Sequence, residues 1–396
     1  MAMHSIRPGW ALLSLFSILS KTNCEILTPV AENVCKLPAA TVGRLSVGFT
    51  VPNTFPTNTT SVGTLRATMV FVDFEDTPAN ETPASLYNFF MPGASDWYST
   101  ASYGRLKLEV HADTSKFYRM PKASTTYKWD RSGLDQETYI ADLAKVIGRN
   151  TTFQDSDVLY IVPTKAAKHI SYSPTRMWPI ALQNGVSMKT GVTFGQDAFE
   201  VWGFKVLNHE SGHVMSLPDL YPFAPGLEVG AWVGGYDIMG LISGTSPDYF
   251  AWNKWKLGWL DDNQVDCVST KGTSRHVITP LEKTGGVKAA AVKLSATKAF
   301  VVELRTTSNA PCSIGLIGYI VNTAGANMGP TDAPIEVLDP HANDRGCSPE
   351  GGRKTGAAAN FATGDKAMNF PSHGIKVNIV GVKDGNYEIT IDWNGK

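Results

Sequence analysis

The sequence carries almost no net charge and no strongly basic stretch. Its 396 residues include 35 lysines and arginines against 36 aspartates and glutamates, a formal net charge of −1. Without a basic excess the chain lacks the electrostatic footprint of a nucleic-acid-binding protein, and without a polybasic run it lacks that of a protein bound to an anionic membrane surface. We therefore expect neither nucleic acid nor membrane among its partners. The length suffices for one large or two moderate domains.

The sequence also lacks an apolar run long enough to cross a bilayer. The apolar stretch Trp10–Ser20 follows a short basic start and is too short to span, which is typical of a secretory signal peptide. Cleavage after Cys24 would place Thr22 and Cys24 at the small-residue positions. We predict a signal peptide over residues 1–24 and a secreted, extracellular protein with no membrane span. A first core segment of the fold is the alternative for this stretch.

Three N-glycosylation sequons agree with export. They begin at Asn58, Asn80 and Asn150. Each is a weak signal alone, because so short a pattern recurs by chance. Together with the signal peptide they favour a eukaryotic secretory route.

Cysteine is scarce, with five in the chain. Cleavage after Cys24 leaves four, and an even count in a secreted chain predicts two disulfides with three pairings open. Their spacing favours a bond between Cys312 and Cys347, and the other two are Cys35 and Cys267. Cys35 is also a candidate for a latency switch that occupies a metal site, but a structural disulfide is the favoured interpretation.

The apolar patterns divide the chain into a mixed N-terminal part and a β-rich C-terminal part. Residues 25–62 are rich in Pro, Thr and Asn and are predicted to be an extended leader or short pro-segment. Over 63–262, buried strands at 68–74 and 157–162 alternate with helical spacing, which predicts an α/β-type catalytic domain. Residues 263–396 hold strand patterns between turns and are predicted to form a mainly β, sandwich-like domain. The expected fold class is α+β.

The most specific pattern in the chain is His209-Glu-Ser-Gly-His213. Residues four apart on a helix share a face, so His209 and His213 can present two imidazole nitrogens to one metal ion. Glu210 then lies where it can take a proton from metal-bound water. The helix is expected from about residue 203 to 215, because Pro218 forbids much continuation. The pattern predicts one catalytic zinc ion with Glu210 as the catalytic base.

A peptidase zinc site usually has a third protein ligand. Asp219 lies ten residues after His209, an interval that resembles metzincin-type peptidases, whose third ligand follows a turn after the helix. Those motifs normally carry glycine at the turn, where this chain has Ser216. A left-handed conformation costs a non-glycine residue about 1 kcal/mol, which is tolerable. Asp219 is the favoured third ligand, and Glu228 is the alternative.

Five further motifs accompany His209–His213: Leu217–Tyr221, Tyr236–Met239, Ala251–Leu260, Phe71–Asp76 and Ser102–Leu106. Together these motifs resemble the immune inhibitor A-type secreted metallopeptidases. The resemblance extends over most of residues 65–330, and it implies a secreted, zinc-dependent endopeptidase with a metzincin-like catalytic domain. It also implies that Met239 forms an apolar floor beneath the zinc. The leader is much shorter than the inhibitory pro-segments of that family.

The resulting functional prediction is a secreted, monomeric zinc endopeptidase that hydrolyses internal bonds of protein or peptide substrates. We expect the substrate to pair with an edge strand within residues 177–193, and Tyr221 or Tyr236 to be candidates for a hydrogen bond to the oxyanion. One alternative is a catalytically silent secreted binding protein on a peptidase scaffold. Another is a zinc exopeptidase or amide hydrolase.

Two further features have simple structural interpretations. Asp73, Glu75 and Asp76 are a candidate for structural calcium, although an acidic strand end exposed to solvent is the favoured reading. The tryptophans at 252, 255 and 259 are expected to pack in the core rather than to form a binding platform.

Overall fold

The computed structural model describes residues 33–40, 45–49, 59–148, 155–183, 185–244, 248–306, 314–338, 360–361 and 367–395. The predicted signal peptide, the sequons at Asn58 and Asn150, and Cys312 and Cys347 lie outside these residues. The asparagine of the remaining sequon, Asn80, is exposed. The structure contains 20% helix and 31% strand, a mixed α+β class as predicted.

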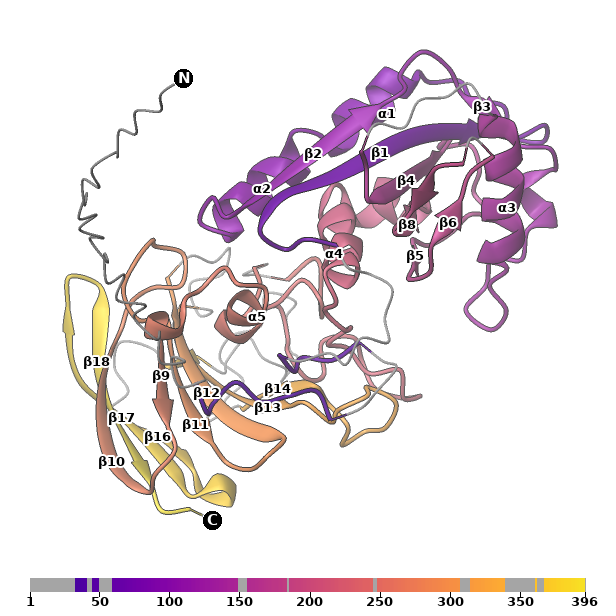
Figure 1. Cartoon of the computed structure of the whole chain (residues 1–396). Coiled ribbons are helices and arrows are strands. Elements are labelled where there is room, and N and C mark those ends of the chain that lie inside the picture. Colours follow the sequence, from indigo (N-terminus) through magenta and orange to yellow (C-terminus); the bar gives the residue numbers. More distant parts are fainter. Residues whose placement is uncertain are drawn as a thin grey trace, which may run out of the picture. The chain divides into compact units, whose positions relative to one another are not determined.

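A mainly parallel sheet organises the N-terminal part (Figure 1). Its strands follow the order β2-β1-β4-β8-β5, with β3 beside the end of β1, and all pairs are parallel except β5 with β8. Strand β4 is buried at every position, as expected of a strand covered on both faces. The buried strands predicted at 68–74 and 157–162 correspond to β1, which ends one residue before the prediction, and to β4, which begins and ends one residue after it. The bounds are β1 (Gly63–Asp73), β2 (Leu106–Ala112), β3 (Tyr118–Arg119), β4 (Val158–Pro163), β5 (Thr175–Arg176) and β8 (Thr190–Thr193).

Alternation along β1 directs side chains into two different cores. Met69 and Phe71 belong to a cluster with residues of α1, α2 and α4, whereas Val70 and Val72 belong to one with residues of α3. The helix that carries the histidines therefore packs on the same face as α1 and α2. The helices are α1 (Pro83–Phe90), α2 (Gly93–Ala101), α3 (Gln136–Ile147), α4 (Lys205–Val214) and α5 (Ala251–Lys256).

Short elements complete the N-terminal part. The π-helix η2 (Ala198–Trp202) precedes α4, and a separate ribbon pairs β6 (Ile180–Ala181) with β7 (Ser187–Met188). Single 3-10 turns lie at η1 (Ser124–Thr126) and η3 (Asp262–Gln264). Helix α4 starts two residues later than predicted, and each of its residues from Val206 to Val214 is buried. It is a central helix rather than a surface one.

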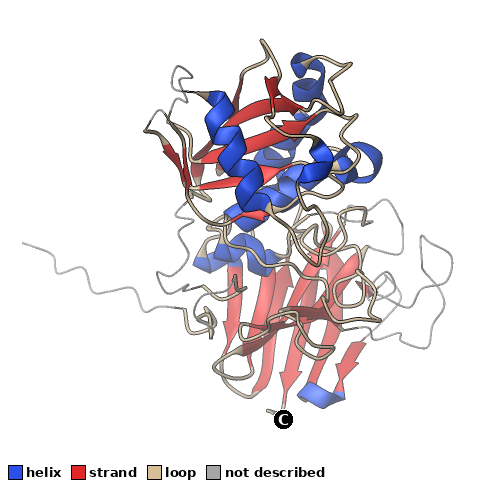
Figure 2. Cartoon of the chain, turned by 90° about the vertical axis from the view of Figure 1, so that its right-hand side faces the viewer, coloured by secondary structure: helices blue, strands red, loops and turns tan. Residues whose placement is uncertain are grey.

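The C-terminal strands form two sheets (Figure 2, strands in red). One has the order β14-β13-β12-β11-β9 with β15 beside β13, and the other β10-β18-β17-β16. Phe300 and Val302 of the first sheet share a buried cluster with Val377 and Ile389 of the second. The elements are β9 (Val265–Val268), β10 (Gly272–Ile278), β11 (Ala289–Lys293), β12 (Lys298–Arg305), β13 (Gly315–Asn322), β14 (Ile335–Val337), β15 (Asn360–Phe361), β16 (Ala367–Phe370), η5 (Pro371–His373), β17 (Ile375–Lys383) and β18 (Asn386–Trp393).

The largest hydrophobic cluster crosses the predicted boundary at residue 262. It joins core residues of the first sheet to Val301 and Tyr319 on β12 and β13, through the aromatic residues around α5. Trp252, Trp255 and Trp259 are at most 2% exposed, so they pack in the core as predicted. Residues 33–396 accordingly form one compact unit.

A disulfide joins Cys35 to Cys267 on β9, with 5.8 Å between their Cα atoms. Cys35 is therefore a structural cysteine, the interpretation favoured over a metal-blocking one. The bond is one member of the expected two, and the favoured Cys312–Cys347 pair lies outside the described residues. In the part of the chain that the structure describes, no helix combines the length and apolarity needed to cross a membrane.

A buried ion pair connects the C-terminal strands to the loops around the histidines. Glu303 and Arg305 on β12 are both fully buried, and Arg305 Nε donates to Glu303 Oε1 at 2.6 Å. The second carboxylate oxygen accepts from the Ala251 amide at 2.7 Å and the Tyr319 hydroxyl at 2.8 Å. The guanidinium also donates to the main-chain oxygen of Tyr236 at 3.1 Å. The ion pair thus contacts α5 through Ala251, β13 through Tyr319 and the loop that contains Tyr236.

We expect Glu303→Gln to lower the free energy of unfolding by about 3–5 kcal/mol, because it removes the carboxylate charge that pairs directly with the buried Arg305 guanidinium. Chemical denaturation would measure the loss. Glu336→Gln on the same sheet is the matched control, since Glu336 is exposed, and should change stability by less than about 0.5 kcal/mol. Equal stability of the two variants would show that the pair is not a structural tie.

Candidate metal centre

Helix α4 brings its two histidines together. The rings of His209 and His213 lie 4.9 Å apart between centroids and are nearly perpendicular. Both side chains are almost fully buried. Glu210 joins them in a group whose ligand atoms lie within 4.8 Å of one another, and it is the one cluster of potential metal ligands found among the described residues.

Main-chain carbonyls hold both imidazoles in one tautomer. His209 Nδ1 lies 2.6 Å from the oxygen of Ile238, and His213 Nδ1 lies 2.8 Å from the oxygen of Leu217. A carbonyl oxygen only accepts, so each Nδ1 must carry the proton and donate it. In the neutral rings, each Nε2 is then left with a free lone pair, as a metal ligand requires.

The chain reverses after α4 at a left-handed residue. Ser216 has φ 72°, the conformation expected at the position where the resembling motifs carry glycine. The Leu217 amide donates back to the oxygen of Gly212 at 2.9 Å, and the Ser216 amide to that of His213 at 2.8 Å. These are the bonds of a Schellman helix end. The turn returns the following residues towards the histidines.

This return places Asp219 against both histidines. Its Oδ1 atom lies 3.2 Å from Nε2 of His209 and 3.2 Å from Nε2 of His213. A tetrahedral zinc ion with bonds of about 2.0–2.1 Å holds its ligand atoms roughly 3.3 Å apart, which matches these separations. The structure therefore brings together the three residues predicted as ligands. Glu228, the alternative, is exposed.

The chemistry of these three groups fits a metal ion. Asp219 Oδ1 is buried and forms no well-aligned hydrogen bond within the described structure, although both Nε2 atoms lie 3.2 Å away. Burial opposes the charge on His213, but the nearby Asp219 carboxylate raises the pKa of His213 to about 9, so the surroundings favour a positive charge at this position, either a proton on Nε2 or a metal ion in its place. The two imidazoles in turn hold the pKa of Asp219 well below its usual range, against the effect of burial. With both Nε2 atoms deprotonated, these groups would offer three electron-pair donors to a single cation, and a set of two nitrogens and one oxygen suits zinc.

Glu210 is held beside this site by a residue that the sequence patterns did not indicate. Burial raises the pKa of its carboxyl group. The Thr175 hydroxyl lies 2.6 Å from Glu210 Oε2 and 3.1 Å from its main-chain oxygen. Thr175 lies on the edge strand β5, 35 residues earlier in the chain. A single threonine in a two-residue strand has no pattern by which it could be recognised.

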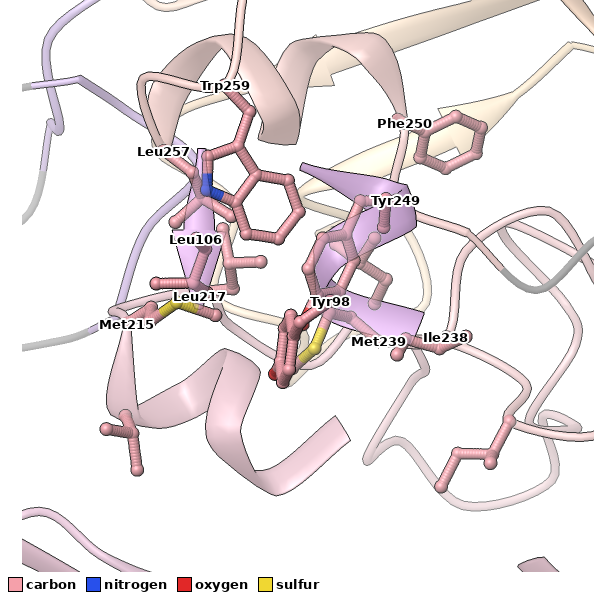
Figure 3. Close-up of a cluster of buried hydrophobic side chains, with 14 of the residues drawn as sticks. Tyr98, Leu106, Met215, Leu217, Ile238, Met239, Tyr249, Phe250, Leu257 and Trp259 are labelled. Carbon is pink, nitrogen blue, oxygen red and sulfur yellow. The ribbon is translucent and has the colours of Figure 1, made fainter. Parts of the chain in front are cut away.

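The turn that contains Met239 supports two of the three candidate ligands. His209 donates to the oxygen of Ile238, and the amide after Asp219 donates to the oxygen of Met239 at 2.8 Å. Met239 is fully buried in the cluster that Figure 3 shows. Its sulfur packs against Gly212, where a Cβ atom would lie only 2.4 Å away. Gly212 therefore has to be a glycine for the turn to approach the helix.

Asp237 organises this turn, a role that the sequence reasoning missed. Its carboxylate accepts from the Met239 amide at 2.8 Å, the Phe250 amide at 2.8 Å and the Asn253 side chain at 3.0 Å. The side chain is fully buried, and burial raises its pKa to about 6. The sequence signal that could have indicated this role is the position of Asp237 two residues before Met239, because Asp side chains often bind backbone amides two residues further along the chain.

A cleft of about 720 Å³ opens at the candidate site. Tyr221 lines it and its ring lies nearly parallel to that of His209, 6.3 Å away. Tyr236 is fully buried and does not line it, so of the two tyrosines only Tyr221 is placed to meet a substrate. The other walls are largely apolar: Leu45, Met177, Trp202, Val206, Phe223, Val229, Leu241 and Ile242.

The edge strand of the main sheet lies just before the predicted range. Within residues 177–193, β8 is an interior strand and β6 and β7 form a separate ribbon. The edge is β5, Thr175–Arg176, which runs antiparallel to β8. The expected range missed this edge strand because a strand of two residues is too short to show an alternating pattern.

The acidic strand end is occupied by protein donors. Arg119 binds both carboxylate oxygens of Asp73 at 2.7 Å. The Ser124 amide and hydroxyl each lie 2.7 Å from the carboxylate of Asp76. With these partners Asp73 is buried, contrary to the expected solvent-exposed strand end, whereas Glu75 and Asp76 are exposed.

Comparisons of the chain with models of protein families and with curated proteins find no match. The resemblance to immune inhibitor A-type peptidases therefore rests on the motifs given above. The geometry of the candidate metal centre does not depend on that resemblance.

We expect Asp219→Asn to weaken zinc binding by about a hundredfold or more, since even changes beyond the direct ligands commonly cost 10- to 100-fold. Competition with a chromophoric chelator would measure the affinity. Glu228→Gln is the matched control and should bind zinc like the unchanged protein. The reverse order of the two affinities would make Glu228 the third ligand.

Proposed function

We propose that the protein is a secreted zinc endopeptidase of the immune inhibitor A type, acting as a monomer on protein or peptide substrates. One observation carries the proposal: Nε2 of His209 and Nε2 of His213 each lie 3.2 Å from Oδ1 of Asp219, beside the buried carboxylate of Glu210. This arrangement opens into a cleft along a sheet edge. A site for binding alone would not need the buried base.

The proposal extends to the finer architecture. Residues 63–262 are taken as a metzincin-like catalytic domain, supported by the parallel sheet, its antiparallel edge strand β5 and the histidine helix beneath. Residues 263–396 are taken as a sandwich-like domain, supported by the cluster that two C-terminal sheets share. The ion pair of Glu303 and Arg305 gives this domain a role in supporting the site.

Each residue then has a chemical task. Zinc, when bound, supplies Lewis acidity, which makes water nucleophilic near neutral pH and polarises a carbonyl group. Glu210 takes the proton from water and passes it to the leaving amine, for which a carboxyl pKa raised by burial is suited. The free edge of β5 offers main-chain groups that pair with an extended peptide. Tyr221, at the wall of the cleft, is placed to donate a hydrogen bond to developing negative charge.

The central test is cleavage of denatured casein by the mature chain. We expect a chelator to abolish cleavage and added zinc to restore it. Glu210→Gln should lower kcat by about 10²–10⁴-fold, the range for general acid–base catalysis, while leaving zinc bound at one ion per chain.

Other outcomes would identify the rival functions. One zinc per chain without cleavage of any protein or peptide would indicate a silent binding protein. Cleavage of free-ended peptides but not of blocked internal ones would indicate an exopeptidase. Absence of zinc binding would contradict the proposal at its base.

Thr175→Val should lower kcat by about tenfold with little change in KM, because the hydroxyl that orients Glu210 is lost and a hydrogen bond to a charged group contributes about 1.5–3 kcal/mol. Thr175→Ser retains the hydroxyl and should keep most of the activity. Thermal unfolding checks that both variants fold alike. Equal kcat in the two variants would remove Thr175 from the mechanism.

A further inference from the structure

Two described pieces of the segment predicted to be a leader or pro-segment, residues 33–40 and 45–49, contribute to the folded core. Cys35, Leu37 and Val47 are at most 1% exposed and belong to the largest hydrophobic cluster. The Phe49 amide donates to the oxygen of Leu37 at 2.9 Å, so two pieces of the segment are also bonded to each other. A pro-segment that is removed on activation has to leave an intact surface behind. Loss of this one would open the core.

Buried polar contacts fasten the segment to elements far along the chain. Trp252 Nε1 donates to the oxygen of Val47 at 2.8 Å, and the Ser46 hydroxyl donates to that of Thr323 at 3.0 Å. Phe49 packs edge-on against Trp252 and Trp255, with ring centroids 5.2 and 4.6 Å apart. Removal would leave the buried Trp252 donor without its acceptor, which is costly.

Lys256 ties the segment to the turn that precedes Asp219. Its ammonium group donates to the oxygen of Ser46 and, at 2.6 Å, to the oxygen of Ser216. Ser216 is the left-handed residue at which the chain reverses after α4. The segment therefore contacts the same turn that delivers the third candidate ligand.

Leu45 reaches the cleft itself. It is half-buried and lines the cleft together with apolar residues from the loops after α4, among them Val229, Leu241 and Ile242. It belongs to the same piece of chain as Ser46, Val47 and Phe49, whose contacts hold it in place. Leu45 thus contributes an apolar wall from a segment more than 160 residues before the histidines.

We propose that the described pieces 33–40 and 45–49 stay in the active enzyme, that residues 45–49 form a fixed wall of the substrate cleft, and that Leu45 selects apolar substrate side chains by their size. This proposal rests on the peptidase function proposed above. The Cys35–Cys267 bond, the buried contacts of Val47 and the position of Leu45 are three separate observations behind it. A removable inhibitory segment is the opposite interpretation of the same residues.

The first experiment cuts the full chain at an engineered site for a sequence-specific protease within residues 51–58. The fragment that carries Leu45 should stay attached without reductant, and casein cleavage should persist. Reduction with release of the fragment should lower casein cleavage at least tenfold and lower the unfolding temperature. The uncut chain in the same reductant controls for loss of the disulfide alone.

Two results would overturn the proposal: cleavage that rises when the fragment is released, or an active secreted enzyme whose first residue lies after Phe49. An unchanged unfolding temperature on release would also overturn it, and this readout does not depend on catalysis. If no form cleaves any substrate while release still lowers the unfolding temperature, the peptidase function fails and the structural part of the proposal stands.

The second experiment measures specificity with peptides that differ only in having Ala, Leu or Phe at one position next to the cleaved bond. Leu45→Ala should shift the ratio of kcat/KM towards the larger side chain by about tenfold, and Leu45→Trp should shift it towards the smaller one, as one or two methylene groups of pocket space allow. Val34→Ala, an exposed apolar residue of the same segment that does not line the cleft, should leave the ratio unchanged. Identical ratios in all variants, at every position varied, would exclude Leu45 from substrate selection.

Discussion

The convergence of two imidazole nitrogens and one carboxylate oxygen is the constraint on which the surrounding structure depends. Lone pairs that face one another repel unless a cation lies between them, so the protein has to hold them there. It does so with main-chain oxygens: Ile238 and Leu217 orient the two rings, and Met239 accepts from the amide that follows Asp219. The Met239 turn is held in its own right by the carboxylate of Asp237. The candidate site is thus supported mainly by backbone whose position other side chains determine.

This support continues into the C-terminal strands. Arg305 donates to the oxygen of Tyr236, directly before Asp237, and its partner Glu303 receives the first amide of α5. The β-rich part of the chain is therefore connected to the candidate ligands through a short series of buried polar contacts. A core of side chains shared across residue 262 has the same effect on packing. The two parts differ clearly in their sequence patterns, but in the structure they share one hydrophobic core.

The sequence allowed some of these features to be predicted because their causes are local. The spacing of His209 and His213 on one helix, the left-handed turn at Ser216 and the return of Asp219 all follow from residues within eleven positions. Thr175 and Leu45 could not be found in this way, since each meets the site across a long stretch of chain and neither belongs to a pattern. The displaced edge strand has a similar cause: β5 is defined by its pairing with β8, not by its own two residues. Composition marked residues 25–62 as a leader or pro-segment, but it carries no information on which of the described residues among them, 33–40, 45–49 and 59–62, are buried.

The Cys35–Cys267 bond has a consequence for durability. It closes a ring of chain 232 residues long that holds the histidine helix, Asp219 and the Met239 turn. Under the proposed peptidase function, the protein is surrounded by copies of itself that can cut its exposed loops. After a single cut within the ring, the two pieces of chain stay covalently joined by the Cys35–Cys267 bond, so they do not diffuse apart. In an oxidising compartment, where such bonds persist, the molecule would survive an internal cut that would divide an open chain in two.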